Sequence, residues 1–189
     1  MVQIGLVLAV LLISVVVLEL RGSHKVDPRS ETDLAIPLRR FARSAMSLIT
    51  AGEDYGYLPA RENRSLLAES WDIRGAPGVQ ATLSSLTQPV GDDVAAAWNL
   101  VRAIHVARMA AGAGYLDETA SWQWVAWAAA GLQARFRDWR PMADAFAQGR
   151  LSWATAAGLD VTTMTRQTQT NIASAQSMWR LMPFSTQLL

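Results

Sequence analysis

Residues 92–114 read DDVAAAWNLVRAIHVARMAAGAG, and this stretch carries the clearest structural signal in the chain. Asp92 and Asp93 place two carboxylates at its start, where negative charge is favourable beside the positive end of a helix dipole. Apolar side chains then recur every three or four residues, at Val94, Trp98, Val101 and at Leu100 and Ile104. Gly112 and Gly114 supply a stop signal. We therefore predict a helix over 92–111.

The sequence on both sides of this helix has the same spacing of apolar residues, and no stretch alternates as a strand would. Asp117 and Glu118 repeat the acidic start, and Pro37 suits the first turn of a helix. We predict further helices at 34–51, at 60–71, through Leu83 and Leu86, at 117–137, as a short helix opened by Pro141, and at 161–182. The predicted fold class is all-α: a compact multi-helix domain at 34–189, preceded by one N-terminal transmembrane helix.

The first twenty residues form the predicted membrane segment. Val2 to Leu18 holds only Gln3 and Ser14 as polar side chains, and about 17 apolar residues is the short end of a bilayer span. A cleaved signal peptide is the alternative, but no Lys or Arg precedes the apolar run and no small-residue cleavage pattern follows it. We therefore expect a retained anchor at 1–20 and a polar linker at 21–33.

The charges beside this segment predict its orientation. Arg21, Lys25 and Arg29 follow it, and no basic side chain precedes it. The positive-inside rule then places the helical domain in the cytoplasm. The expected location is the inner membrane, single-pass, with the lipid bilayer as a partner through residues 2–18 and no known protein partner.

Composition excludes several function classes. The formal net charge is +1, which is too small for the clustered basic surface that nucleic-acid binding needs. The absence of cysteine excludes thiolate nucleophiles and Cys-ligated metals. The two histidines, His24 and His105, are too far apart in sequence for a helical zinc motif. We expect no nucleic-acid partner, no metal and no cofactor.

A set of ordered sequence blocks resembles a known family. The blocks are Leu66-Leu67, Trp71-Asp72-Ile73, Leu83 and Leu86; Ala97 to Arg102; Gly114-Tyr115-Leu116, Glu118 and Trp122; Leu132-Gln133, Phe136 and Trp139; and Gly149-Arg150 with Trp153. Their order and spacing resemble the bacterial family called domain of unknown function 1266 over about residues 60–155, with the anchor and the last helix outside. The resemblance implies a helical domain, sometimes beside a membrane segment, with no assigned activity. The family usually has Asp where this chain has Asn99, which weakens any acidic role there.

Four polar residues spaced three apart make the helix at 92–111 the first candidate site: Asn99, Arg102, His105 and Arg108. Such residues are neighbours on a helix surface. Arg102 could bind a carboxylate or phosphate through two parallel hydrogen bonds, and His105 could donate or accept a proton near neutral pH. In the alternative interpretation, Arg102 neutralises a buried acid such as Asp72 or Glu118, and His105 closes the edge of the core.

Arg150 gives a second candidate, because the sequence flanks it with Trp139 and Trp153. The two indoles could hold a flat ligand beside the guanidinium, although cation–π packing within the fold explains the pattern equally well. The eight tryptophans likewise predict either core packing or a Trp-lined cleft. The candidate ligand-binding residues are therefore Trp98, Asn99, Arg102, His105, Arg150 and Trp153, and no catalytic residue is identified.

Three functions are compatible with these patterns. The first is a membrane-anchored helical module for binding or scaffolding, because no complete catalytic set is present. The second is an enzyme that acts on an anionic small molecule in a cleft lined by Trp98, Arg102, His105 and Arg150. The third is an accessory or immunity-type protein of a secretion or toxin system.

Overall fold

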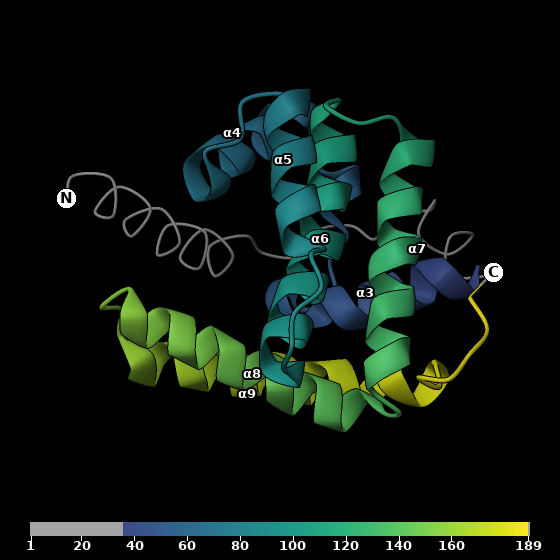
Figure 1. Cartoon of the computed structure of the whole chain (residues 1–189), viewed down its shortest axis with the longest axis vertical. Helices are drawn as coiled ribbons and strands as arrows, with labels where there is room; N and C mark the ends of the chain where they lie inside the picture. The colour runs from purple at the N-terminus through teal and green to yellow at the C-terminus, as the bar shows by residue number, and fades with distance from the viewer. Residues whose placement is uncertain (1–35, 189) are drawn as a thin grey trace.

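The computed structural model describes residues 36–188, which form seven α-helices and one short 3₁₀ helix (Figure 1). The elements are α3 (Pro37–Thr50), η1 (Tyr55–Tyr57), α4 (Ala60–Trp71), α5 (Ala76–Leu86), α6 (Asp93–Ala113), α7 (Glu118–Arg135), α8 (Trp139–Ala156) and α9 (Val161–Leu181). This part of the chain contains no strand. The prediction of an all-α, multi-helix domain is confirmed for it.

Helix α6 is the centre of the fold. Helices α5, α6 and α7 lie side by side, and α8 and α9 cross one end of them (Figure 1). Helix α6 packs against α3, α4, α5, α7, α8 and η1. It can do so because small alanines occupy several of its faces and let neighbouring helices approach closely. Its buried alanines are Ala96, Ala97, Ala103, Ala107, Ala110 and Ala113.

The two acidic start signals act as helix caps. The Asp92 carboxylate accepts a hydrogen bond from the Ala95 backbone N–H at 2.7 Å, and Asp117 accepts one from Ala120 at 2.7 Å. These bonds satisfy backbone donors that have no partner within the helix. The predicted starts of α6 and α7 are therefore correct to within one residue.

The helix predicted at Pro141 is present and has the proline in its first turn, but the predicted short length is wrong. Helix α8 has 18 residues and begins at Trp139, two residues before the proline. A proline this early breaks no intrahelical hydrogen bond, because the first four backbone N–H groups of a helix have no partner within it. The 3₁₀ helix η1 was not predicted either.

An aromatic cluster joins α3, α8, α9 and the C-terminal segment. Trp139 packs against Phe41 at 4.7 Å, Phe184 at 4.8 Å and Trp179 at 5.8 Å between ring centroids. Its indole N–H donates to the Met182 carbonyl at 2.6 Å. Trp139 thus matches the core-packing interpretation of the tryptophans. Among the other tryptophans, Trp127 is 51% exposed, and the remainder are half-buried.

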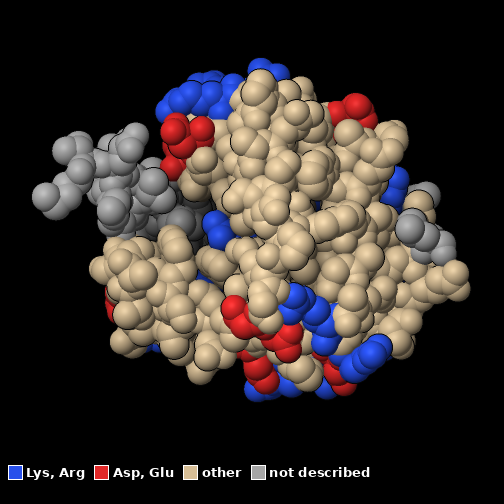
Figure 2. Space-filling view, viewed as in Figure 1, with Lys and Arg blue, Asp and Glu red and all other residues tan. Residues whose placement is uncertain are grey.

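Charged side chains gather at the edges of the face seen in Figure 2, and its middle, over α5, α6 and α7, is uncharged. In residues 36–188, no helix combines the length and apolar character required to cross a bilayer. The transmembrane helix predicted for residues 2–18 lies outside the described residues, as does the linker at 21–33.

Gly112 allows α6 to approach the segment before α4. A Cβ at this position would lie 2.1 Å from the Asn63 amide nitrogen and 2.8 Å from the Tyr55 carbonyl oxygen. That amide is buried and donates to the Tyr55 carbonyl at 2.7 Å. We expect Gly112→Ala to lower the free energy of unfolding by about 1–3 kcal/mol, although alanine is the better helix former.

Urea denaturation of the two proteins measures this difference. Gly78→Ala in α5 is the matched control, because a Cβ there would meet its nearest neighbour, Ile73, at 3.6 Å, an ordinary contact distance. The control should leave stability unchanged or raise it by up to about 1 kcal/mol. Equal effects of the two substitutions would show that the contact at Gly112 carries no cost.

Candidate functional site

Five of the six predicted ligand-binding residues line one cavity of about 110 Å³. The cavity lies where α4, α6, α8 and α9 meet, with Ile49 of α3 and Tyr55 of η1 also in its wall. The five residues are Trp98, Arg102 and His105 from α6, and Arg150 and Trp153 from α8. The packing of α8 on α6 thus brings together two groups of residues that are far apart in the sequence.

Arg102 lies between two indole rings. Its guanidinium carbon is 4.6 Å from the ring centroid of Trp71 and 4.6 Å from that of Trp98. Within residues 36–188 it forms no hydrogen bond or ion pair with an acid. Burial lowers the pKa of Arg102 to about 10, which leaves the side chain cationic at neutral pH. The aromatic faces stabilise this charge without neutralising it.

Arg150 is the second cation of the cavity, and its side chain is only 8% exposed. Its Nη2 donates to the Gln167 side-chain oxygen at 3.1 Å and lies 3.9 Å from the Met164 sulfur. Its Nη1 is buried without a hydrogen-bond partner among the described residues. Burial lowers the pKa of Arg150 to about 10. A buried guanidinium donor without an acceptor is costly, so an acceptor from outside the protein would be favoured there.

His105 lies one helical turn from Arg102 and packs edge-on against Tyr55, with ring centroids 5.0 Å apart. Burial, and secondarily the positive charge of Arg102, lower the pKa of His105 to about 3. Its buried Nε2 has no hydrogen-bond partner in the described structure. At neutral pH the imidazole is therefore uncharged, which differs from the proton donor or acceptor near pH 7 that the sequence suggested.

No Asp or Glu occurs among the described residues that line the cavity. Buried charges are normally paired, and here two guanidinium groups share a largely apolar space without a carboxylate. Three indoles, those of Trp71, Trp98 and Trp153, form much of the wall, and the last two stack at 5.9 Å. The arrangement provides positive charge and flat apolar surface in the same small volume.

The alternative interpretation of Arg102 as the partner of a buried acid is wrong for both acids considered. Asp72 pairs with Arg74 at 3.2 Å on the surface. Glu118 pairs with Arg108 at 3.0 Å. Asn99 is the one predicted site residue that does not line the cavity.

The predicted flanking of Arg150 by Trp139 and Trp153 is only half correct. Trp153 lines the cavity with Arg150, whereas Trp139 belongs to the aromatic cluster around Phe41 and Phe184. The two indoles are fourteen residues apart along α8, which is about 20 Å of helix. No flat ligand of one ring could contact both.

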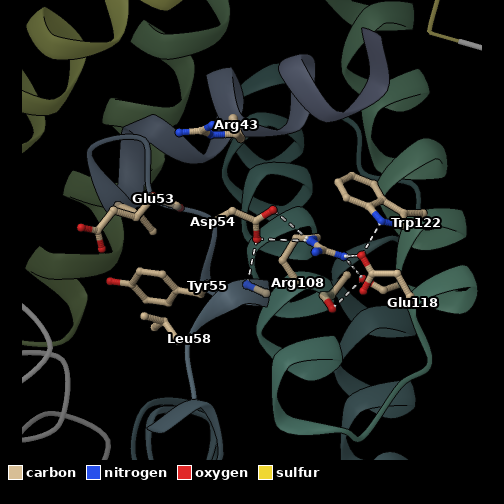
Figure 3. A network of polar contacts seen from close by, with 12 residues as sticks. Arg43, Glu53, Asp54, Tyr55, Leu58, Arg108, Glu118 and Trp122 are labelled. Carbon is tan, nitrogen blue, oxygen red and sulfur yellow. Dashed lines mark hydrogen bonds and ion pairs between the residues drawn. The ribbon is translucent and has the colours of Figure 1, made fainter. Parts of the chain in front are cut away.

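Arg108 forms a separate polar network on the other side of α6 (Figure 3). Its buried guanidinium lies 3.2 Å from the Asp54 carboxylate, 3.0 Å from that of Glu118 and 4.1 Å from the ring centroid of Trp122. The Trp122 indole N–H donates to the same Glu118 oxygen at 2.7 Å. Each charged member has an ion-pair partner, although Nη2 of Arg108 makes no hydrogen bond among the described residues. The network therefore fixes η1 and the start of α7 onto α6. It is a structural element and not part of the cavity.

Sequence reasoning missed several residues of the wall, chiefly Trp71, Phe146, Met164 and Gln167. Each follows the normal apolar spacing of its helix or, for Gln167, lies among many polar residues of α9. Asp54 gave no signal either, because it follows Glu53 in a loop outside the predicted helices. In the described part of the chain, no three His, Asp or Glu side chains gather as metal ligands would.

Comparison with known proteins gives one match. A family model described as "Protein of unknown function (DUF1266)" matches residues 89–184, just over half of the chain. No curated protein and no solved structure matches. The matched range includes α6 to α9, so the last helix lies inside it, whereas the sequence blocks placed the resemblance at about 60–155.

Proposed function

The chain belongs to the DUF1266 family of proteins of unknown function, and we propose that its helical domain is a binding module for a small organic anion. The anion lies in the cavity between Arg102 and Arg150, with its apolar part against the indoles. The anchor predicted at residues 2–18 would hold this module at the bilayer. The proposal combines the first predicted function with the ligand class of the second.

One observation carries the proposal: the buried Arg150 and the half-buried Arg102 share a cavity that has no acid among its described lining residues. A carboxylate or phosphate bound there would supply the missing negative charge. It would also accept the hydrogen bond that Nη1 of Arg150 does not make within residues 36–188. Charge-assisted hydrogen bonds of this kind are about twice as strong as neutral ones.

The size and walls of the cavity limit the ligand. An apolar protein cavity of about 150 Å³ holds one benzene molecule. The cavity between Arg102 and Arg150 is about 110 Å³, so the enclosed part of the ligand is no larger than a single ring. Indole faces favour an apolar group beside the acid.

Binding is better supported than turnover. His105 is the one imidazole in the wall, and with a pKa lowered to about 3 by burial it is a weak base and carries no proton to donate at neutral pH. The carboxylate of Glu118 is bound to Arg108 and Trp122 and is not in the wall of the cavity. No observation favours the accessory or immunity-type role.

Isothermal titration calorimetry of the full-length protein in lipid nanodiscs tests the proposal. Benzoate should bind, and benzamide, which has the same shape without the charge, should bind at least tenfold more weakly. Arg150→Gln should weaken benzoate binding at least tenfold, because one charged partner is lost. Arg74→Gln is the matched control: it removes the same charge from an exposed side chain and should leave benzoate affinity unchanged.

The stability of the same variants separates a binding role from a structural one. Arg150→Gln should leave the free energy of unfolding unchanged or raise it, because it removes an uncompensated buried charge. Failure of both benzoate and phenyl phosphate to bind would sink the proposal. So would equal affinity for benzoate and benzamide.

A further inference from the structure

A groove of about 430 Å³ lies between α8 and α9 and shares part of its wall with the cavity. Its mostly apolar lining includes Ala147 and Leu151 from α8 and Ile172 and Ala173 from α9. Arg150 and Met164 line both the groove and the cavity. The two spaces therefore meet at these side chains, one of them a flexible methionine.

We infer, on the basis of the proposed function, that the ligand is a single-chain amphiphile. Its acidic head lies in the cavity with Arg102 and Arg150, and its alkyl chain passes Met164 and lies in the groove between α8 and α9. The inference names one chemical class of ligand, an anion with an unbranched apolar chain.

The position of Arg150 supports this arrangement. The side chain is buried at the boundary of the two spaces and has an unpartnered Nη1 among the described residues. Because Arg150 lines both spaces, the chain of an acid bound to its guanidinium can enter the groove without crossing the core. A neutral apolar molecule would fill the groove but leave both guanidinium groups without an anion.

The length of the groove also fits an alkyl chain of medium length. Its lining on α8 extends from Arg140 to Leu151, which is roughly 16 Å at the 1.5 Å rise per residue of an α-helix. At its far end Arg140 and Asp144 form an ion pair at 3.0 Å. Contact with further methylene groups would remove water from these charges, which is unfavourable. The apolar part of the groove therefore ends near this pair.

A peptide or a second copy of the chain fits the groove less well. A bound extended peptide would need free backbone partners from the wall, and the groove is walled by two helices, whose interior backbone groups already bond to each other. A second copy would cover the groove, but it would need an acidic side chain that reaches the buried Arg150. An amphiphile is the one occupant that satisfies both spaces together.

The dependence of affinity on chain length tests the inference. Butanoate, hexanoate and octanoate carry the same head, and each is titrated into the full-length protein in nanodiscs, with empty nanodiscs as the blank. Each added methylene group should increase affinity at least twofold, because it removes apolar surface from water. Octyl phosphate in the same titration shows whether the head can be a phosphate. Equal affinities along the carboxylate series would overturn the inference.

A variant that fills the groove tests whether the alkyl chain of the ligand lies there. Ala173→Trp places a large ring in the groove from an exposed position of α9 and should weaken octanoate binding at least tenfold without changing butanoate binding. Ala81→Trp, at an exposed position of α5, is the matched control and should change neither. Equal loss for both acids in Ala173→Trp would contradict a chain in the groove. So would a dimer that this variant dissociates, because the groove would then be a subunit interface.

Failure of this inference is distinguishable from failure of the proposed function. If benzoate binds in an Arg150-dependent manner and chain length has no effect, the cavity binds anions and the groove has no part in it. If benzoate and octanoate both fail to bind, the proposed function itself is wrong.

Discussion

Arg108→Leu is expected to lower the free energy of unfolding by about 3–5 kcal/mol, because it leaves a buried carboxylate without a counter-ion. The Arg108 side chain is fully buried, and that of its partner Asp54 is 5% exposed. Asp54 also accepts a hydrogen bond from the Gly56 backbone N–H at 2.8 Å, so its displacement would disturb the whole of η1. Chemical denaturation monitored by circular dichroism measures the loss.

The surface ion pair of Arg135 and Asp93 provides the matched control for this prediction. Its two side chains are partly exposed and their charged atoms lie 3.2 Å apart, a distance similar to that in the buried pair. Arg135→Leu should therefore cost less than about 1 kcal/mol. The double variant Arg108→Leu with Asp54→Leu should recover much of the lost stability, since it leaves no unpaired buried acid. A loss of under 1 kcal/mol for Arg108→Leu alone would mean that Asp54 finds water or another partner.

Local sequence patterns were sufficient to predict most of the helices of the described region. The apolar spacing identifies each buried face, and acids such as Asp92 and Asp117 mark starts with a direct physical cause, the unpaired backbone N–H groups. Helix α8 shows where such patterns fail. Pro141 lies in the first turn of α8, as expected, but the helix expected to be short has 18 residues.

The geometry of one helix explains which site residues could be predicted. Residues three apart differ by about 300° around a helix, so each step turns back by about 60°. Arg102 and His105 therefore face the same cavity, with Trp98 one turn before them. Arg108 is two such steps beyond Arg102 and is therefore rotated by about 120° from it. Its side chain faces Asp54 instead. Asn99, one step in the other direction, likewise falls outside the wall.

The features that could not be predicted from the sequence are contacts between segments that are far apart along the chain. Asp54 and Arg108 are 54 residues apart, and no local pattern links a loop acid to a particular arginine. The meeting of Arg102 with Arg150 depends on how α8 crosses α6, which is a property of packing. The sequence named Trp98 and Trp153 as candidate wall residues, but it also placed Trp139 beside Arg150, whereas Trp139 packs in the aromatic cluster around Phe41.

His105 should make the protein less stable as the pH falls. Burial, with a further contribution from Arg102, lowers its folded-state pKa to about 3 from the ordinary value of 6.5, so between these two pH values the unfolded chain binds a proton that the folded chain does not. The contribution of His105 to the free energy of unfolding is fully present above about pH 6.5. It is lost progressively as the pH falls toward 3. A shift of this size corresponds to a loss of up to about 5 kcal/mol.

The variant His105→Met isolates this effect, because methionine fills a similar volume and does not titrate. Wild-type and variant proteins share the acid denaturation that their carboxylates cause, so the difference in free energy of unfolding between them reports on His105 alone. That difference should be constant above pH 7 and should move in favour of the variant between pH 6.5 and the lowest pH at which both proteins fold. If the free energies of unfolding of the two proteins changed in parallel with pH over this range, the imidazole would accept a proton inside the folded protein. Saturating benzoate should reduce the pH dependence of the wild type, because an anion beside Arg102 opposes the positive charge that helps to keep His105 neutral.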